Sequence, residues 1–375
     1  MTARFDKWCV AAVVLGLAAL PSPLATNGGW TDTPGYLAVV VLVIALFAMF
    51  AWKGVTALWH SALLVLLVVL GAAASIDFVH SLDDGVKASS GFWLFNLALW
   101  AVAWRGIDGI AAFRATDPTR QKLANLLVPA AFGLWMIYLW EIAAVGFGVP
   151  QVLLPAPGMI GARFLGSLDI LWDDFQQTFL KAVLAGYFIG CGSGFLVSIL
   201  VDRVSFLQRG LLPLGNLVSA LPIVGVAPIM VMWFGFDWQS KAAVVVIMTF
   251  FPMLVNTITG LAASGTLERE LLRSYAASYW QTLFKLRLPA ALPFIFNALK
   301  INSTLALIGA IVAEFFGTPI VGMGFRISTE VGRMNVDMVW AEIVVAALAG
   351  SAFYGVMALG ERALTFWHPS FRERR

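Results

Sequence analysis

Four ionisable side chains of this sequence lie inside, or at the end of, long apolar stretches. They are Glu141, Lys300, Glu314 and Glu342. An ionisable group inside a membrane is energetically costly, so each marks a candidate functional position. The sequence shows no nucleophile–base set and no paired carboxylates in a soluble cleft, which catalysis would need. The chemistry that these groups suggest is ion coupling or the passage of a polar solute.

One of the four belongs to a polar helix face. Asn297, Lys300, Ser303 and Thr304 are three or four residues apart, which places them on one side of a helix. That face could line a polar path for a solute. In the alternative interpretation, Lys300 extends to the membrane surface, and the amide and hydroxyl groups bond between helices.

The main polar interruption between apolar stretches is residues 264–293, SGTLERELLRSYAASYWQTLFKLRLPAALP. It is too short for a soluble domain and too charged to lie in lipid. Thr266 is the expected helix cap, and Glu268 and Glu270 suit the positive end of that helix. The Glu270 carboxylate could accept charge-assisted hydrogen bonds from a partner protein; the alternative is a solvated acid.

The same segment carries an apolar face and a run of small residues. Apolar side chains recur every four positions, as on one side of a helix, at Leu267, Leu271, Tyr275, Tyr279 and Leu283. The small residues 276–278 lie in the middle, where a partner or a bend could approach closely. Pro289 and Pro293 mark the start of the next helix, because proline is tolerated in a first turn.

The composition is that of a polytopic membrane protein. Of the 375 residues, 60% are hydrophobic and 12% are charged, about half the charged share of soluble domains. The two cysteines and three histidines suggest no disulfide framework and no metal-ligand cluster. No GxxxxGK[ST] motif occurs, so the chain cannot bind ATP through a P-loop. We expect no cofactor bound by this chain and no nucleic-acid partner.

We predict ten membrane spans from apolar length. The expected ranges are 8–25, 36–52, 57–77, 91–104, 125–147, 178–201, 210–234, 242–263, 291–313 and 337–360. The first could instead be a signal peptide, although no convincing cleavage site follows it. Gly186 and Gly190 form a GxxxG that predicts close helix packing. Pro222 and Pro228 interrupt the seventh span, and broken helices expose backbone to a cavity in transporters.

The distribution of positive charge predicts an orientation. If the N-terminus is cytoplasmic, most of the 24 lysines and arginines fall in the inner segments. Cytoplasmic segments of membrane proteins carry such an excess. Residues 264–289 and 361–375 are therefore expected in the cytoplasm, and residues 148–177 and 314–336 outside. Both termini would be cytoplasmic.

Residues 270–289 resemble the cytoplasmic coupling loop, or EAA loop, of ABC-importer permeases. The family pattern reads Glu-Ala-Ala, three residues, Gly, nine residues, an aliphatic residue, any residue and Leu-Pro. Glu270 stands at the glutamate, and the end of the pattern fits at the right spacing with Leu286, Leu288 and Pro289. Three positions depart from it: Leu271 and Leu272 replace the alanines, and Ala276 replaces the glycine. These departures bear on how closely a partner packs there.

Further motifs in the same order resemble the permeases for nitrate, sulfonates, taurine, bicarbonate and pyrimidine precursors. They are Trp140-Glu141, VLLPAP at 152–157, Ala220-Leu221-Pro222, Ala227-Pro228, Trp233-Phe234-Gly235, GAIVAEFFG at 309–317 and Trp367-His368-Pro369. A polar run near residues 115–122 marks the boundary. Residues 1–120 would be a transmembrane extension of unknown role, expected to be an accessory or scaffold bundle, with a sensor or second transport module as the alternative.

The resemblance implies an all-α polytopic membrane protein. A type I ABC importer transmembrane domain of about six helices would occupy residues 121–375, after about four additional transmembrane helices. The chain would be the permease subunit of a binding-protein-dependent importer in a bacterial inner membrane, a transport subunit and not an enzyme. Its implied partners are cytoplasmic ABC ATPase subunits that bind the ATP and Mg, an extracytoplasmic substrate-binding protein, a second permease subunit (identical or related) and membrane lipid.

The matched loop implies which residues couple to the ATPase: Glu270, Leu271, Leu272, Arg273, Tyr275, Ala276, Ala277, Leu288 and Pro289. The predicted substrate path comprises Asn297, Lys300, Ser303, Thr304, Glu314, Pro222 and Pro228. The solute would be small and polar, such as a sulfonate, nitrate or a pyrimidine-like or nucleobase-like compound. The central helices offer no fixed charge cluster, which favours the nucleobase-like compound.

Two alternatives belong to other classes of protein. The first is an ion- or proton-coupled secondary transporter, which would need a coupling site of its own built from Glu141, Lys300 and Glu342. The second is a membrane-embedded enzyme, which the missing catalytic cluster disfavours.

Overall fold

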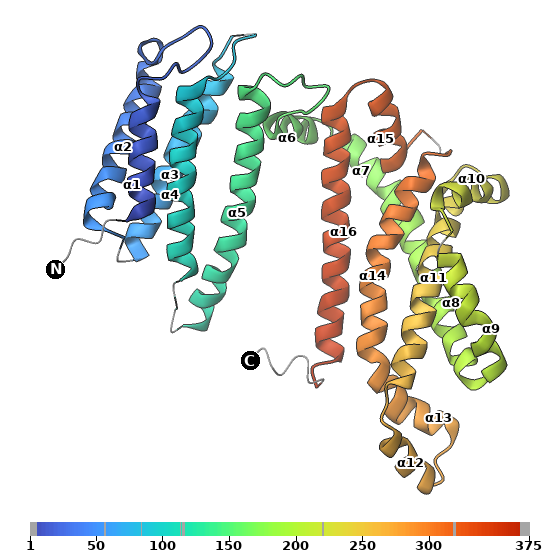
Figure 1. Ribbon diagram of the computed structural model, residues 1–375. Helices are drawn as coiled ribbons and strands as arrows, with labels where there is room; N and C mark the ends of the chain where they lie inside the picture. The colour runs from blue at the N-terminus through green and yellow to red at the C-terminus, as the bar shows by residue number, and fades with distance from the viewer. Residues whose placement is uncertain are drawn as a thin grey trace. The chain divides into compact units, whose positions relative to one another are not determined.

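The computed structural model describes residues 6–55, 58–83, 85–112, 114, 117–219, 221–317 and 320–367. Within these ranges the regular elements are helices, as predicted (Figure 1). The chain divides into two compact units, Met1–Gly161 (unit 1) and Ala162–Arg375 (unit 2).

Unit 1 is a bundle of helices that begin where the sequence offers a cap or a proline. The Asp6 carboxylate accepts hydrogen bonds from the backbone N–H groups of Trp8 and Cys9, and Pro34 and Pro118 stand at the first turns of two other helices. The elements are α1 (Lys7–Ala19), η1 (Trp30–Asp32), α2 (Pro34–Lys53), α3 (Leu58–His80), α4 (Ser90–Ala111) and α5 (Pro118–Gly146), with α6 (Pro157–Gly166) at the boundary.

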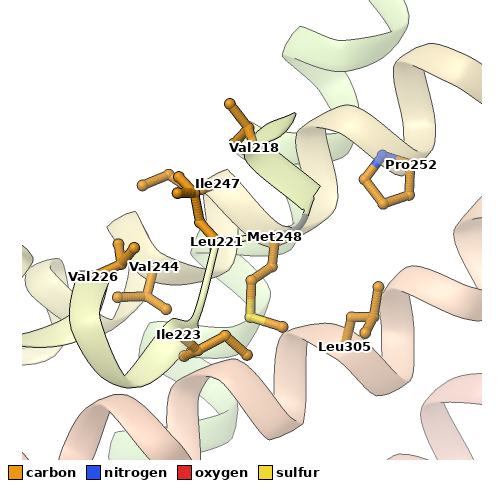
Figure 2. A pocket seen from close by; sticks show the side chains of 9 residues that line it. All are labelled: Val218, Leu221, Ile223, Val226, Val244, Ile247, Met248, Pro252 and Leu305. Carbon is orange, nitrogen blue, oxygen red and sulfur yellow. The ribbon is translucent and has the colours of Figure 1, made fainter. Parts of the chain in front are cut away.

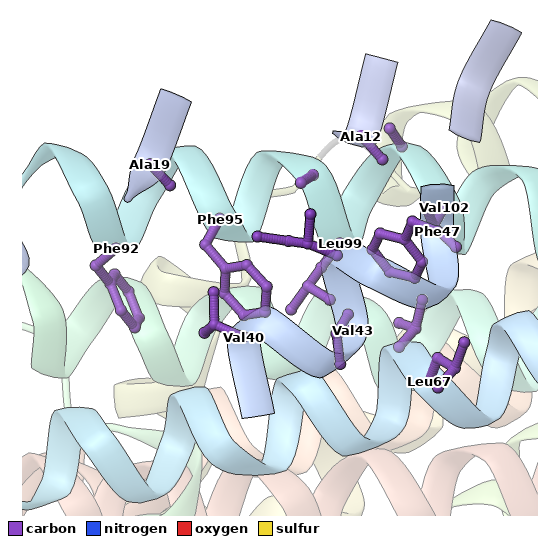
Figure 3. Packing of buried hydrophobic residues seen from close by; sticks show 14 of the residues in the cluster. Ala12, Ala19, Val40, Val43, Phe47, Leu67, Phe92, Phe95, Leu99 and Val102 are labelled. Atoms are coloured by element: carbon purple, nitrogen blue, oxygen red, sulfur yellow. The ribbon is translucent and has the colours of Figure 1, made fainter. Parts of the chain in front are cut away.

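The core of unit 1 is one apolar cluster formed by α1, α2, α3 and α4, with Tyr138 and Ile142 of α5 (Figure 3). Phe47, Phe92 and Phe95 in it are fully buried; between membrane helices such side chains stabilise a bundle through van der Waals packing, because lipid is as apolar as they are. Helix α5 joins the bundle through a buried hydrogen bond from the Tyr138 hydroxyl to the Asn96 side chain on α4. A packed core and buried polar contacts therefore hold unit 1 together.

Unit 2 contains two helices that run on through a π-helical turn. One covers Leu168–Arg203 and the other Tyr279–Glu314. The elements are α7 (Leu168–Phe175), the π-helix η2 (Gln176–Val183), α8 (Leu184–Arg203), α9 (Ser205–Ser219), α10 (Ile223–Phe234), α11 (Trp238–Ala262), α12 (Thr266–Ser274), α13 (Tyr279–Thr282), the π-helix η3 (Leu283–Arg287), α14 (Leu288–Glu314), α15 (Met323–Gly332) and α16 (Val336–Leu364).

Helices α8, α11 and α14 form the centre of unit 2 (Figure 1). Glycines let α8 and α11 approach closely, because a Cβ added at Gly186 would lie 2.7 Å from the Ala242 carbonyl oxygen, and one at Gly194 would lie 2.5 Å from that of Phe250. A Cβ at Gly190 would overlap Thr249. The predicted close packing at the GxxxG is confirmed.

Seven helices in the described ranges are long and apolar enough to cross a membrane, and they correspond to seven of the ten predicted spans. The first prediction, 8–25, becomes the 13-residue α1. The fourth becomes the 22-residue α4. This helix carries Asn96, Arg105 and Asp108, and it is less apolar than the seven spanning helices.

The predicted span 210–234 is wrong as a single helix. Helix α9 ends at Ser219, and α10 starts at Ile223 after Pro222. Proline has no N–H to continue a helix, and it pushes the preceding residue out of helical geometry. Two other helices are longer than predicted, because α7 begins at Leu168 and α13 at Tyr279, within stretches too polar to be counted as spans.

Candidate functional site

Residues 264–289 form two short helices, α12 and α13, at one end of unit 2, away from α10 and α15 (Figure 1). We call this end the loop end. No residue of α12 is buried. Leu267, Leu271 and Tyr275 are 77%, 55% and 77% exposed. Large apolar side chains that stand together on a protruding helix indicate a surface for a partner.

The predicted continuous helix face through this segment is wrong. Gly265, not Thr266, precedes α12 at the cap position, and the helix ends at Ser274. A new helix starts after Ser278, whose hydroxyl accepts the Gln281 N–H while the Gln281 side chain accepts the Ser278 N–H. As a result only the first half of the apolar face points outward, whereas Leu283 is fully buried.

The bend between the two helices falls at Ala276, whose φ angle is 54°. This left-handed conformation costs a residue with a Cβ roughly 1–2 kcal/mol, and glycine adopts it freely. The family pattern has glycine at this position, so the structure gives a backbone reason for it. The small residues 276–278 left open a bend or the close approach of a partner, and the chain bends at Ala276.

The residues predicted to couple to an ATPase divide by exposure. Glu270, Leu271, Arg273, Tyr275 and Ala276 are exposed. The others lie half-buried where the segment meets the helices of unit 2: Leu272, Ala277, Leu288 and Pro289. Glu270 lies in the second turn of α12, beyond the first turn that the sequence suggested.

The base of the segment is held by polar contacts that the sequence did not predict. Arg287 in η3 binds both carboxylate oxygens of Asp202 at the end of α8, each at 2.6 Å. The Tyr279 hydroxyl donates to the same carboxylate at 3.0 Å. Arg269 donates to the carbonyl oxygens of Leu261 and Ala262 at the end of α11. The protruding helices are therefore fixed to the bundle through few side chains.

A cavity of about 250 Å³ opens beside the break between α9 and α10 (Figure 2). Met248 extends from α11 into the space between Ile223 on α10 and Leu305 on α14. All the side chains that line the cavity are apolar: Val218, Leu221, Ile223, Val226, Val244, Ile247, Met248, Pro252 and Leu305. Pro222 stands at the break itself, and Pro228 is half-buried within α10.

The predicted polar face of α14 is divided in the same way. Asn297 and Thr304 are exposed. Lys300 pairs with Glu361 on α16 at 2.6 Å, and the Ser303 hydroxyl donates to the carbonyl oxygen of Lys300 within its own helix. Of these four residues, only Asn297 and Thr304 therefore present polar side chains that no other described helix of unit 2 covers.

Comparison with known proteins places this architecture. Residues 182–366 match the family described as binding-protein-dependent transport system inner membrane component. The formylaminopyrimidine transport permease protein ThiX of Halalkalibacterium halodurans is 33% identical over 241 residues, which are 64% of this chain and 96% of the relative. The chain belongs to this family. It is a permease subunit of an ABC transport system.

Two further relatives of the permease differ in the solute named. The riboflavin transport system permease protein RibX of Chloroflexus aurantiacus is 29% identical over 259 residues, 68% of this chain and 96% of the relative. The putative aliphatic sulfonates transport permease protein SsuC of Bacillus subtilis is 29% identical over 252 residues, 66% and 89% of the two chains.

At the end of unit 2 opposite the loop end, the permease buries acids that hold α15. Glu314 accepts hydrogen bonds from the Thr178 hydroxyl at 2.8 Å and from the Gly324 N–H at 2.7 Å. Asp174 accepts the Gly322 N–H at 2.6 Å and an Arg326 bond at 2.8 Å. Burial alone would lower the pKa of Arg326, but its bond to Asp174 raises the pKa above the ordinary value. Glu314, predicted on the path, therefore anchors the start of α15.

Glu141, in unit 1, has fixed partners. Its carboxylate accepts the Gly158 N–H at 2.6 Å and lies 2.7 Å from His80. In unit 2, Glu342 is fully buried. Among the residues that the structure describes, no group of His, Cys, Asp and Glu could hold a metal ion.

The boundary predicted at residue 120 stays a prediction. By contacts, α5 belongs to unit 1, where it packs on α3 and α4. By similarity, a match that covers 68% of the chain has to include most of α5. The helix thus lies in the stretch shared with known permeases while packing against the extension.

Proposed function

We propose that residues 264–289 receive the movement of a cytoplasmic ABC ATPase and that the chain passes a small uncharged heterocycle across the inner membrane. The observation that carries the proposal is the pair α12–α13, an exposed apolar and charged projection on a permease without a P-loop. In this arrangement the ATPase closes on ATP, displaces α12, and switches the path to face outward. Hydrolysis resets it.

The orientation follows from the same proposal. The loop end lies in the cytoplasm, and α10 and α15 lie at the outer end, where a substrate-binding protein delivers the solute. A second permease subunit, identical or related, faces this one across the path. The exposed Asn297 and Thr304 suit such a shared path, since no other helix of unit 2 covers them.

Labelling of single cysteines tests the orientation. In a background with Cys9 and Cys191 replaced, a cysteine at position 278 should react only when the reagent reaches the cytoplasmic side. Ser278 is exposed, so access in the fold does not limit the reaction. Labelling of this position from outside intact cells alone would refute the orientation and the ATPase contact together.

The cavity beside the broken helix supports the choice of solute. Its lining consists of Val, Ile, Leu and Pro side chains and the thioether of Met248, and it contains no charged side chain. Such a wall accommodates a flat, uncharged ring and provides no counter-charge for an anion, whose desolvation would then be uncompensated. The named solutes of two relatives, a pyrimidine and riboflavin, contain such rings.

Filling this cavity tests the choice of solute. A Cβ at Gly309 on α14 would overlap the Met248 sulfur, so Gly309→Ala should push Met248 into the cavity. We expect reduced uptake of a formylaminopyrimidine or riboflavin by the assembled transporter. The control is Gly192→Ala, because no atom lies within 4 Å of a Cβ there. Equal uptake by both variants, or transport of taurine but of neither ring compound, would contradict the uncharged-ring proposal.

A gradient-driven mechanism is distinguishable by experiment. It would use Glu141, Lys300 and Glu342, but the first two are held by His80 and Glu361. In membrane vesicles that contain the permease without an ATPase, we expect no uptake under a proton or sodium gradient. Uptake there would favour the secondary transporter.

A further inference from the structure

The contact between Asp202 and Arg287 joins the loop segment to the bundle in an unusual place. Asp202 is the penultimate residue of α8. A carboxylate is disfavoured at the negative C-terminal end of a helix unless a cation offsets it. Arg287 provides that cation in a two-bond geometry, with both side chains nearly buried at 13% and 11% exposure. The pair is 85 residues apart in the sequence.

Arg287 also reaches a third helix. Its Nε donates to the Leu261 carbonyl oxygen at 3.1 Å, one of the carbonyls that the end of α11 leaves without a partner in the helix. One guanidinium therefore ties the ends of α8 and α11 to the start of α14. Arg203, the neighbour of Asp202, lies over the rings of Tyr279 and Trp280 at 5.7 and 6.0 Å, so the contact extends to α13.

The backbone that carries Arg287 is π-helical. The Leu288 N–H bonds to the Leu283 carbonyl oxygen, one residue further back than in an α-helix. Such turns are rare, and they are found mostly at functional sites. They allow a helix to change register locally. Arg287 thus lies in an irregular turn between the exposed α12 and the membrane helix α14.

The helix that carries Asp202 near its C-terminal end runs through unit 2 to the opposite end. Leu168–Arg203 is one helical stretch of 36 residues. Near its other end, Thr178 and Asp174 bind Glu314 and the start of α15. The two long helices of unit 2 are therefore tied together at both ends, by Asp202 and Arg287 at one and by Thr178 and Glu314 at the other.

We propose that the Asp202–Arg287 pair is the positioning contact through which movement of residues 264–289 reaches α8 and α11. The inference rests on the proposed coupling function of that segment. When α12 is displaced, a rigid two-bond contact moves the end of α8 with it, and the helix passes the movement to the contacts that hold α15. Without the pair, the segment would still bind an ATPase through its exposed face, but its movement would be absorbed in the π-helical turn.

The test uses the complete transporter of permease, ATPase and substrate-binding protein in proteoliposomes. Asp202→Asn keeps the shape of the side chain and removes its charge. Arg287→Lys keeps the charge and loses the planar two-bond geometry. For both we expect ATPase binding and basal hydrolysis to be retained, while the solute transported per ATP hydrolysed falls by about tenfold, as expected for loss of a charge-assisted contact. The exchanged double variant Asp202→Arg with Arg287→Asp should recover part of that ratio.

Unit 1 offers a matched control. Arg105 and Asp6 form an Arg–Asp pair at 2.5 Å with 18% and 11% exposure, and Arg105 also donates to a backbone carbonyl, that of Val55, at 3.0 Å. Asp6→Asn removes a pair of the same chemistry and burial that does not touch the loop segment. It should leave the transport ratio unchanged, whatever it does to abundance.

Each result decides for or against the contact. An unchanged ratio in both Asp202→Asn and Arg287→Lys overturns the proposal, while loss of uptake in Glu270→Ala would still uphold the coupling segment. If neither variant assembles although Asp6→Asn does, the pair holds the fold and the proposal is also overturned. Absence of ATP-dependent uptake by the unmodified complex would refute the proposed function itself.

Discussion

Each of the two units of this permease contains a nearly buried Arg–Asp pair, and the two pairs serve different purposes. In unit 1, Arg105 on α4 ties Asp6 before α1 to Val55 after α2. In unit 2, Arg287 ties the end of α8 to the end of α11. Each arginine thus joins its own helix to the ends of two others through one carboxylate and one backbone carbonyl.

What differs is the structure attached to each pair. Asp6 also caps α1 with its carboxylate, and that helix packs into the apolar cluster of unit 1. Arg287 is followed by α14 and preceded by helices that expose most of their surface. A polar contact beside a packed core adds to stability. The same contact beside an exposed projection sets where that projection stands. Local chemistry therefore does not assign a role; the attached elements do.

The largest effect that we predict is loss of uptake in Glu270→Ala. Glu270 is exposed on α12, so folding should change by no more than about 0.5 kcal/mol. Loss of a charge-assisted contact with the ATPase costs roughly 1.5–3 kcal/mol, which weakens docking about tenfold or more. The measurement is uptake and solute-stimulated ATPase activity at equal membrane abundance.

Glu268→Ala is the control for that prediction. Glu268 lies on the same helix, in its first turn, and it is outside the family pattern. It should keep most of the uptake. If both variants transport normally at normal expression, residues 264–289 have no central role, and unit 2 would resemble unit 1 in using its arginine only for stability.

The next effect concerns the centre of unit 2. Its helices α8 and α11 meet through glycines, as α3 and α4 of unit 1 also do at Gly106 and Gly109. A leucine at Gly190 would collide with Thr249 and Val246, and overpacking of this kind costs about 1–3 kcal/mol or more. We expect Gly190→Leu to lower membrane abundance and thermal stability, measured by detergent-resistant fluorescence of a tagged chain. Gly192→Leu on the exposed side of the same helix should behave as the unmodified protein, and equal loss in both would show that this packing does not depend on glycine.

The length of the apolar stretches predicts some of the helices correctly and others not. Apolar length found the helices of seven spans, because membrane helices need about 20 apolar residues. It counted residues 210–234 as one span, because they are as apolar as a true span on both sides of the break; Pro222, which interrupts this stretch in the sequence, was the signal of the break. It also started two helices too late, at 178 and 291, because Asp174 and Arg287 look like loop residues until their partners are known.

The Asp202–Arg287 pair could not be predicted from the sequence, for a physical reason. Both residues counted only as charges between predicted spans, and nothing in one sequence shows which span ends are neighbours. A signal did exist: an acid at the end of one predicted helix has no favourable partner in that helix. The glycine of the family pattern likewise signalled the left-handed residue at Ala276, where the small residues alone leave a bend and the approach of a partner as alternatives.

A smaller effect is expected at this bend. Ala276→Gly removes a Cβ from a left-handed conformation, and it should stabilise the bend by at most about 1 kcal/mol. Ala276→Val should destabilise it, because a branched side chain is strongly disfavoured there. Hydrogen exchange of the α12 and α13 amides would measure both. Slower exchange in the valine variant would be inconsistent with the strained bend, and unit 1 amides serve as the internal reference.

The smallest effect should follow removal of the extension. A chain that begins at Arg114 keeps α5 and all of unit 2, and we expect it to insert and to bind its ATPase. The face of α5 that packs on α3 and α4 would then meet lipid, which is as apolar as the side chains it replaces. Two side-chain contacts of α5 are lost, the bond from the Tyr138 hydroxyl to Asn96 and the pair of Glu141 with His80. Glu141 keeps the Gly158 N–H, so abundance should fall modestly. Tyr138→Phe combined with Glu141→Gln in the short chain removes the unpaired hydroxyl and the unpaired charge, and should restore part of the abundance. Failure of the short chain to bind the ATPase at normal membrane levels would show that unit 1 is integral to the permease, and that its contacts do more than stabilise a bundle.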